Sequence, residues 1–382
     1  MRVYLDNAAS SVLDPEVLEY MLPWYREFHG NPSSVHYHGR NLRSAIEQSR
    51  KKIAELTGSS PGEIFFTSGG TEADNMAIRS TVEGLGIRHI VSTRIEHHAV
   101  GHCIELLEEK GHAKVTWLDV DSRGHIDLKE LREVLKSSPR SLVCLMHANN
   151  EIGTMLDLEA VGRICREFDA VYHSDTVQTM GNVKYDTGNL PVDFLTASAH
   201  KFYGPKGIGF LYIRKGLKIP PLILGGGQER NMRAGTENVP AIAGMAFALE
   251  KCIRNLEEKN EKLWKLKLFL KTELEARIPG VEFNGETAKD NSLVTVLNTF
   301  FPIDSADSLL LMNLDIAGIS CSGGSACTSG SVKGSHVLAG IGCSAKRSAN
   351  SVRFSFGVQN TAEELEFTVG KLEEIMKVKT PV

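Results

Sequence analysis

From about residue 60 to residue 215, short runs rich in apolar and β-branched residues alternate with longer stretches of amphipathic character. This alternation is typical of βαβ units, in which helices connect the strands of a mostly parallel sheet and cover both of its faces. Because the short runs are apolar at successive positions, we expect the strands to be buried on both sides. The expected strands are 64–67, 89–93, 114–118, 141–146, 170–173, 194–197 and 208–213.

After residue 238 the pattern becomes helical. Pro240 opens a run that reaches about Ala276, with apolar residues at spacings of three and four, and this run predicts one long connecting helix. Two later apolar runs, 292–297 and 351–356, are separated and followed by helical stretches. The second half of the chain therefore predicts a small α+β domain.

The expected fold class is α/β, with a large domain built on a mostly parallel seven-stranded sheet flanked by helices, and a smaller α+β domain. A chain of 382 residues exceeds the size at which a single core usually keeps growing, which also favours two domains. We place the large domain at 16–250 and form the small domain from 1–15 together with 251–382.

One segment, Gly318 to Ser335, has an unusual composition. Eleven of its eighteen residues are glycine or serine, and Cys321 and Cys327 lie among them. Such a segment buries little apolar area against the entropy of ordering it, so we expect a poorly ordered loop. A surface linker is one interpretation, but the two cysteines favour a loop that takes part in chemistry.

Charge and composition narrow the classes of function. The chain has 43 Lys and Arg against 47 Asp and Glu, a net charge of −4, so it lacks the cationic excess of proteins that bind nucleic acids or anionic membranes. No uncharged apolar stretch approaches the length of a bilayer span, and Arg2 and Asp6 interrupt any secretory pattern at the start. We therefore expect a cytoplasmic protein whose seven cysteines are thiols.

A candidate phosphate-binding turn follows the first expected strand. Ser68, Gly69, Gly70 and Thr71 precede a helix, and small residues with free backbone amides at a helix N-terminus favour an anion. An ordinary glycine turn with Thr71 as the N-cap is the alternative. The pattern GxxxxGK[ST] does not occur, which excludes a nucleoside-triphosphate P-loop.

Polar residues also follow four other expected strands, at 96–98, 147–151, 173–178 and 198–207. Ligands of open α/β sheets bind beyond the carboxyl ends of the strands, so these groups converge on one edge. A phosphate cup, a lysine, a carboxylate and a flat ring partner are the set that pyridoxal 5′-phosphate requires. Asp175 suits the carboxylate role because a nearby negative charge keeps a ring nitrogen protonated.

A metal site is not expected. His98 and His102 are four residues apart but lack the glutamate of a helical zinc motif, and Cys321 and Cys327 lack CxxC spacing. We expect both histidines to be solvated surface residues.

Three runs carry a resemblance to a known family: 198–207 (SAHKFYGPKG), 149–153 (NNEIG) and 324–329 (GSACTS). Together with 4–9 (YLDNAA) and 31–34 (NPSS), they resemble the NifS/IscS class of cysteine desulfurases. These are fold-type I pyridoxal-phosphate enzymes of the class V aminotransferase superfamily. The resemblance covers essentially the whole chain.

The resemblance implies a role for each candidate cofactor residue. Lys201 would bind pyridoxal phosphate covalently, His97 would stack on the ring and pass protons, and Asp175 would pair with the ring nitrogen. Gln178 and Asn150 would bind the phenolate side of the ring and the substrate. The residues expected at the phosphate are Gly70, Thr71, Ser198, His200 and, from the neighbouring subunit of a homodimer, Thr236.

The resemblance also implies the reaction. Arg353 would bind the carboxylate of L-cysteine, and Cys327 would attack the substrate sulfur, leaving L-alanine and a persulfide on Cys327. That sulfur would pass to an iron–sulfur cluster scaffold or another thiol acceptor. The motif departs from the family pattern at 322–324, and the extra Cys321 is a possible competitor.

Two alternatives remain open from the sequence. The chain could be a selenocysteine lyase or another class V pyridoxal-phosphate enzyme, or a cofactor-bearing protein that only positions a scaffold partner. Intact Lys201 and Cys327 argue against the last of these.

Overall fold

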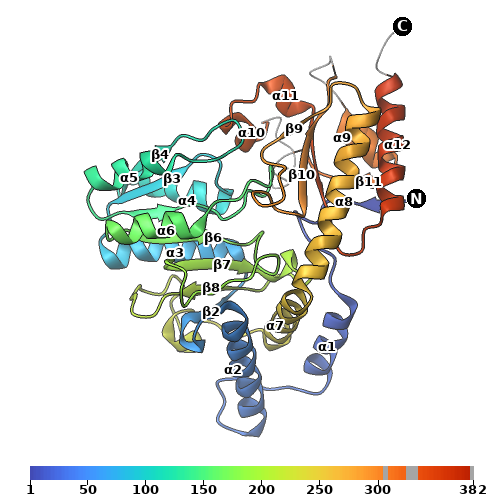
Figure 1. The fold of residues 1–382 in the computed structure, drawn as a ribbon. Helices are drawn as coiled ribbons and strands as arrows, with labels where there is room; N and C mark the ends of the chain where they lie inside the picture. The colour runs from blue at the N-terminus through green and yellow to red at the C-terminus, as the bar shows by residue number, and fades with distance from the viewer. Residues whose placement is uncertain (304–308, 324–333, 379–382) are drawn as a thin grey trace.

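A seven-stranded sheet forms the centre of the larger part of the chain (Figure 1). The computed structural model describes residues 1–303, 309–323 and 334–378. The strand order is β2-β8-β7-β6-β5-β3-β4; β3 to β7 are mutually parallel, and β8 is antiparallel to both β7 and β2. The strands are β2 (Ile64–Thr67), β3 (His89–Thr93), β4 (Lys114–Leu118), β5 (Leu142–Cys144), β6 (Val171–Asp175), β7 (Phe194–Ser198) and β8 (Gly209–Ile213).

The predicted α/β class and the seven strands are confirmed, but the expectation that every strand is buried on both sides is wrong for β4. This strand lies at the edge of the sheet, and only its last residue, Leu118, is fully buried. An edge strand has a neighbour on one side only, so its start remains open to solvent.

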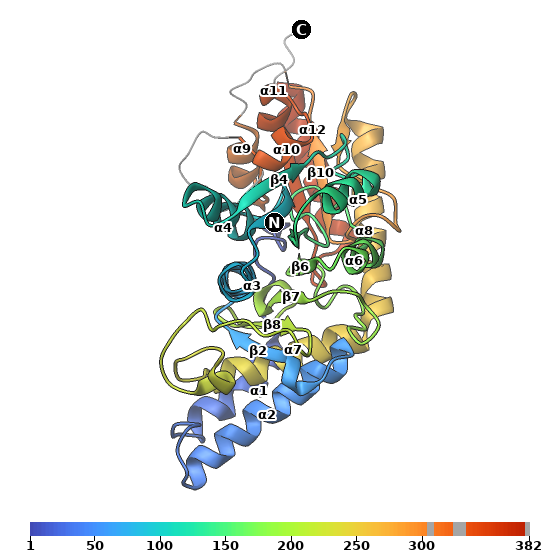
Figure 2. The same ribbon diagram turned by 90° about the vertical axis from the view of Figure 1, so that its left-hand side faces the viewer.

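Helices cover both faces of this sheet. Figure 2 shows α3 (Gly70–Leu85) and α4 (His98–Glu109) on one side, and α5 (Leu128–Ser137) and α6 (Leu158–Glu167) on the other. Two separate apolar cores fill the interfaces, one on each face. Two further helices, α1 (Pro15–Arg26) and α2 (Tyr37–Thr57), pack against α7 (Val239–Arg254) below β2.

The single long helix expected from Pro240 to Ala276 is wrong: the structure has two helices, α7 and α8 (Leu256–Arg277), separated by Asn255. Asn255 has φ −106° and ψ 23°, outside the helical region. Asparagine is a poor residue for a helix interior and a good one at a helix boundary, because its side chain competes for backbone hydrogen bonds. The break allows α7 to pack against α1 and α2 while α8 packs against α12 (Ala362–Val378).

A small antiparallel sheet, β12-β10-β9, forms the other part of the molecule. Its strands are β9 (Glu282–Asn284), β10 (Val296–Phe300) and β12 (Ser351–Ser355). The strand expected at 292–297 therefore begins at Val296, since Ser292 and Leu293 are instead bonded to Thr154 and Gly153 of the larger part. Three short helices accompany this sheet: α9 (Leu310–Ile316), α10 (His336–Gly340) and α11 (Ala345–Ala349).

The N-terminal residues join this smaller part. β1 (Val3–Tyr4) pairs in parallel with β11 (Ile319–Ser320), and Val3 and Leu5 lie in the same apolar core as residues of α8, β12 and α12. Ser11 and Asp14, by contrast, donate backbone hydrogen bonds to His200 and Tyr203 of the larger part. The exact domain boundaries stay a prediction. Among the described residues, no helix combines the length and apolar character that crossing a bilayer would need.

Two lysines of α8 are buried and bond to the segments that approach the larger part. Lys267, 1% exposed, donates through Nζ to Ser292 Oγ at 2.8 Å and Leu293 O at 3.0 Å. Lys259 donates to Asn182 Oδ1 at 3.0 Å and to Gly181 O. Burial lowers the pKa of Lys267 from 10.5 to about 7.

Because burial lowers the pKa of Lys267, we predict that the free energy of unfolding depends on pH. Because the folded-state pKa lies below the unfolded value, the unfolded chain binds more protons between about pH 7 and 10.5, so Lys267 makes stability rise with pH in that window. From pH 7 to pH 9 the contribution is at most roughly 2.5 kcal/mol. Urea unfolding followed by circular dichroism should show a smaller rise for Lys267→Met than for the wild type. Lys265→Met, an exposed position on the same helix, is the control; equal rises in all three proteins would contradict the prediction.

Candidate active site

A cavity of about 250 Å³ lies where the carboxyl ends of β6 and β7 meet the N-terminus of α3 and strand β12. It brings together ten of the site residues expected from the sequence. These are Gly70, Thr71, His97, Asn150, Asp175, Gln178, Ser198, His200, Lys201 and Arg353. Their placement follows from the parallel strands, whose polar continuations all emerge at one edge.

The N-terminus of α3 forms the anion-binding wall of this cavity. The helix begins at Gly70 with Gly69 as its N-cap, and no side chain caps it, so the alternative with Thr71 as N-cap is wrong. Gly69 has φ +156°, and a Cβ on Gly70 would lie 2.6 Å from Val177 Cγ2. Both positions thus require glycine, and uncapped N–H groups remain available to a phosphate.

Lys201 enters the cavity from a tight turn that follows β7. The 3₁₀ turn η2 (Ala199–Lys201) directs its amine toward the N-terminal segment, where Nζ donates to Ala8 O at 2.5 Å and Ala9 O at 2.9 Å. Two carbonyl oxygens therefore hold the amine in place. The sequence marked the Tyr4–Ala9 segment by resemblance only, and its contribution to holding the lysine was missed.

Asp175 and His97 supply a carboxylate and a flat ring. Asp175, at the end of β6, accepts a hydrogen bond from Val177 N at 2.8 Å, and its pKa is raised to about 6, first by burial and then by Asp74. His97 caps α4 by accepting from Ala99 N through Nδ1, and burial lowers its pKa. At neutral pH Asp175 is thus an anion, which suits a protonated ring nitrogen, and His97 is an uncharged imidazole, which suits stacking on the ring.

Gln178 and His200 complete the polar lining. Gln178 Nε2 donates to Ala8 O at 3.0 Å, which orients its amide. His200 Nδ1 lies 3.3 Å from Ser10 Oγ, and burial and the neighbouring lysines lower its pKa to about 4. His200 is therefore a neutral hydrogen-bonding group rather than a cation at neutral pH.

Arg353 forms the opposite wall from β12 and is 1% exposed. Its Nη1 donates to Asn150 O at 2.9 Å and its Nη2 donates to Asp6 Oδ1 at 2.8 Å, while Nε has no partner among the described residues. A buried guanidinium with an unused donor is suited to a carboxylate ligand. Asp6, which holds the guanidinium, is a residue to which the sequence assigned no role.

The two ends of the cysteine loop are bonded to residues around the cavity. Ser322 Oγ donates to Asp6 Oδ1 at 2.8 Å, and the Ser322 backbone pairs with that of Arg353. At the other end, Ser335 Oγ donates to the buried Glu151 carboxylate, and His336 Nε2 lies 2.9 Å from Glu96 O. The expected lack of order in Gly318–Ser335 is wrong for these ends, because strand pairing of β11 and the cap of α10 stabilise them.

The two cysteines of this loop differ. Cys327 lies outside the described residues, so its predicted role stays a prediction. Cys321 is half-buried, and burial raises the pKa of its thiol to about 12. A thiol that stays protonated at neutral pH is a poor nucleophile, so Cys321 is a weak competitor.

Several expected positions lie elsewhere. Thr236 is exposed and does not line the cavity, and any contact with cofactor would have to be made to another subunit. His98 is half-buried rather than fully solvated as we expected, because its ring stacks on that of His102 with centroids 4.4 Å apart and lies 4.3 Å from the tilted ring of His336. His102 is exposed, as expected.

The sequence missed one carboxylate in the cavity wall. Asp74 lies on α3, one turn after Gly70, and lines the cavity at 1% exposure. The sequence contained an indication of this burial, because Asp74 lies among the apolar residues Ala73 and Ala77 on the buried face of the same helix. An acidic residue on an apolar helical face is a candidate for a buried polar role.

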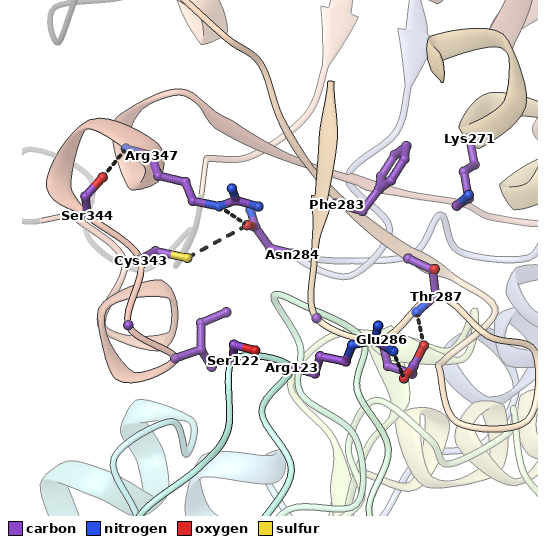
Figure 3. A pocket seen from close by; sticks show the side chains of 13 residues that line it. Ser122, Arg123, Lys271, Phe283, Asn284, Glu286, Thr287, Cys343, Ser344 and Arg347 are labelled. Atoms are coloured by element: carbon purple, nitrogen blue, oxygen red, sulfur yellow. Dashed lines mark hydrogen bonds and ion pairs between the residues drawn. The ribbon is translucent and has the colours of Figure 1, made fainter. Parts of the chain in front are cut away.

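A second cavity, of about 540 Å³, lies between β9 and the α10–α11 segment (Figure 3). Figure 3 shows Arg347 pointing to Asn284, which it reaches through Nε at 2.7 Å, and Arg123 beside Glu286, its partner at 3.0 Å. Its charged groups are therefore already paired. None of the expected site residues lines this cavity, and we assign the chemistry to the smaller one.

The smaller cavity fits pyridoxal phosphate. It offers an amine at Lys201, a carboxylate at Asp175, a flat neutral ring at His97 and an uncapped helix N-terminus at Gly70. Each of these matches one part of that cofactor. No group of three or more His, Cys, Asp or Glu within 1–303, 309–323 and 334–378 could hold a metal ion.

Comparisons with known proteins agree with this donor set. Residues 3–367 match the family model described as Aminotransferase class-V. The chain is 45% identical to the cysteine desulfurase IscS of Dictyoglomus turgidum, over 98% of this chain and 94% of that protein. It is 42% identical to the cysteine desulfurase IscS of Clostridium botulinum strain Hall, over 98% and 94%. A solved structure titled NifS-like protein superposes with a TM-score of 0.91 at 39% identity, covering 99% of this chain and 100% of that one.

Proposed function

The chain belongs to the class V aminotransferase family, and on that basis we propose that it is a pyridoxal-phosphate-dependent cysteine desulfurase. It converts L-cysteine to L-alanine and carries the sulfur as a persulfide on Cys327. The observation that carries the proposal is the single cavity that holds Lys201, Asp175 and Arg353 between the bonded ends of the cysteine loop. Formation of alanine from L-cysteine by the purified protein, supplied with pyridoxal phosphate, tests it.

The cofactor, when bound, supplies an electron sink for bond changes at the Cα of the amino acid. The residues that line the cavity would hold it through four kinds of contact. Lys201 would bind it covalently, the N–H groups at Gly70 and Thr71 together with Ser198 and His200 would bind its phosphate, Asp175 would bind the ring nitrogen, and His97 would stack on the ring. Gln178 and Asn150 would orient the remaining edge of the ring and the substrate.

Lys201 also moves the proton at Cα. Its Nζ donates hydrogen bonds to the carbonyl oxygens of Ala8 and Ala9, and these two bonds fix the direction of the amine. Positioned general bases and acids of this kind contribute about 10²- to 10⁴-fold to a rate. The neutral ring of His97 is the second group that can carry a proton in the cavity.

Cys327 performs the sulfur transfer. Its thiolate attacks the sulfur of the substrate, so that an S–S bond forms while the C–S bond breaks, and the electron pair of that bond stays on the carbon fragment, which takes up protons to become alanine. Position 327 lies five residues after Ser322, which is bonded at the cavity wall. Five residues span at most about 18 Å, so the length of the chain keeps position 327 within that distance of Ser322.

We extend the proposal to the assembly. The protein is a cytoplasmic homodimer in which Thr236 reaches the phosphate of the neighbouring subunit, and the persulfide passes to an iron–sulfur cluster scaffold or another thiol acceptor. The exposure of Thr236 supports this arrangement, since an exposed hydroxyl is accessible to a neighbouring subunit.

The proposed binding of the substrate carboxylate by Arg353 leads to a testable prediction. Arg353→Ala should raise the KM for L-cysteine roughly 30- to 1,000-fold, because it removes a charge-assisted contact to the carboxylate worth about 2 to 4 kcal/mol. The visible spectrum of the bound cofactor should not change. Steady-state kinetics measure the KM of each variant. Arg347 lines the second cavity, and Arg347→Ala is therefore the control. An unchanged KM in Arg353→Ala would remove this arginine from the substrate site.

A further inference from the structure

A buried pair of titratable groups, Asp74 and His173, lies beside the cofactor cavity, which Asp74 lines, and has no part in the mechanism described above. Asp74 Oδ1 lies 3.2 Å from His173 Nε2, and the two side chains are 1% and 0% exposed. Within the described part of the chain, no lysine or arginine forms an ion pair with Asp74. His173 Nδ1 has no partner there either.

Burial and the Thr196 hydroxyl are the causes of the pKa shift of Asp74, and no cation is among them, although His97 and Lys201 line the same cavity. His173 and Asp175 face it from β6, since residues two apart on a strand share a face. The other titratable groups that interact with it are Glu96, the Cys103 thiol of α4 and the Cys144 thiol of β5. A second anion at this place would thus be costly, because buried like charges disfavour each other.

The two aspartates differ in their hydrogen-bond donors. Asp175 accepts from Val177 N at 2.8 Å and from Thr196 Oγ1 at 3.5 Å, which favours its ionised form. In the described part of the chain, the hydrogen-bonding partners of Asp74 are His173 and the Thr196 hydroxyl. Burial raises the pKa of Asp74 to about 7 and lowers that of His173 to about 4, so the proton of this pair is lost or gained near neutral pH.

We propose that Asp74 and His173 form a proton-sharing pair behind Asp175, and that this pair sets the charge of the cofactor cavity. With the proton on the pair, Asp175 is the single anion facing the ring nitrogen. When the pair loses its proton to solvent, a second negative charge appears on Asp74 and stabilises positive charge on the lysine-bound cofactor. Asp74 is thus a positioning residue that acts through Asp175, and the inference rests on the proposed function.

Two measurements on the holoenzyme without cysteine test the pair. The first is the infrared spectrum of protein labelled with ¹³C-carboxyl aspartate, which separates Asp74 from Glu96, a carboxyl group whose pKa is also raised by burial. We expect the C=O stretch of a protonated aspartate to disappear as pH rises through neutrality, and to be absent from Asp74→Asn. Asp175 makes no such change, because it stays ionised against the ring nitrogen. Absence of a titrating band in the wild type would overturn the proposal, and this holds even if the variant does not fold.

The second measurement is the pH midpoint of the visible absorbance of the lysine-bound cofactor. Replacing a group that can be an anion with a neutral one withdraws stabilisation from nearby positive charge, so Asp74→Asn should lower the midpoint by about half a pH unit or more. Glu83→Gln, an exposed acidic position on the same helix, should leave it unchanged. Equal midpoints in the wild type and Asp74→Asn would overturn the coupling. A protein that acquires no visible absorbance with pyridoxal phosphate would instead contradict the proposed function.

Discussion

Replacement of Lys201 by alanine is expected to abolish the covalent attachment of pyridoxal phosphate while leaving the fold intact. Only the lysine amine can form the linkage, and its side chain contacts the N-terminal segment through carbonyl oxygens that water can satisfy. Borohydride reduction followed by intact-mass measurement should add the mass of the reduced cofactor to the wild type and nothing to the variant. Turnover of L-cysteine should fall by roughly 10³-fold or more, because the variant also lacks the base that acts at Cα.

Lys206→Ala is the matched control for this experiment. Lys206 lies five residues further on, is exposed, and does not line the cavity. It should retain both the covalent cofactor and the activity. If the Lys201 variant still gained the cofactor mass after reduction, the assignment of the Schiff-base lysine would be wrong.

Replacement of Cys327 by serine is expected to eliminate the protein-bound persulfide. The hydroxyl of serine is not ionised at neutral pH and cannot accept sulfur to form a stable persulfide. The variant should still bind pyridoxal phosphate and respond spectrally to cysteine, since Lys201, Asp175 and Arg353 remain. Sulfur transfer to a small thiol acceptor should fall by roughly 10³-fold or more, the size of effect expected for loss of a nucleophile.

Cys321→Ser provides the comparison within the same loop. Burial raises the pKa of the Cys321 thiol to about 12, so its removal should change turnover only a few-fold, about 1 kcal/mol or less in the barrier. Loss of persulfide in the Cys321 variant with retention in the Cys327 variant would reverse the assignment of the nucleophile.

The parts of the site that the sequence predicted are those governed by simple rules. Parallel strands end at one edge, so the residues after them converge whatever the details of packing. Lys201, Asp175 and His97 directly follow or end such strands and were found in this way. Arg353 was found by resemblance alone, and the structure places it on β12, which is buried along its whole length.

Other features depend on contacts that a sequence pattern does not contain. The periodicity of α7 continues into α8, and only the packing of each helix against different neighbours stabilises the break at Asn255. The need for glycine at position 70, where α3 begins, depends on the close approach of Val177, which follows the end of a distant strand. Asp6 and Asp74 act on Arg353 and His173, partners 347 and 99 residues away. Such long-range pairs become visible only when the fold is known.

A single-turnover reaction with the purified holoenzyme tests the central claim most directly. The protein is mixed with L-cysteine in the absence of any sulfur acceptor, alanine is quantified, and the added sulfur is mapped by mass spectrometry of peptides. The account predicts one alanine for each new sulfur atom and places that sulfur on Cys327. Cofactor-dependent loss of cysteine without alanine, or alanine formed with the sulfur on another cysteine, would contradict it.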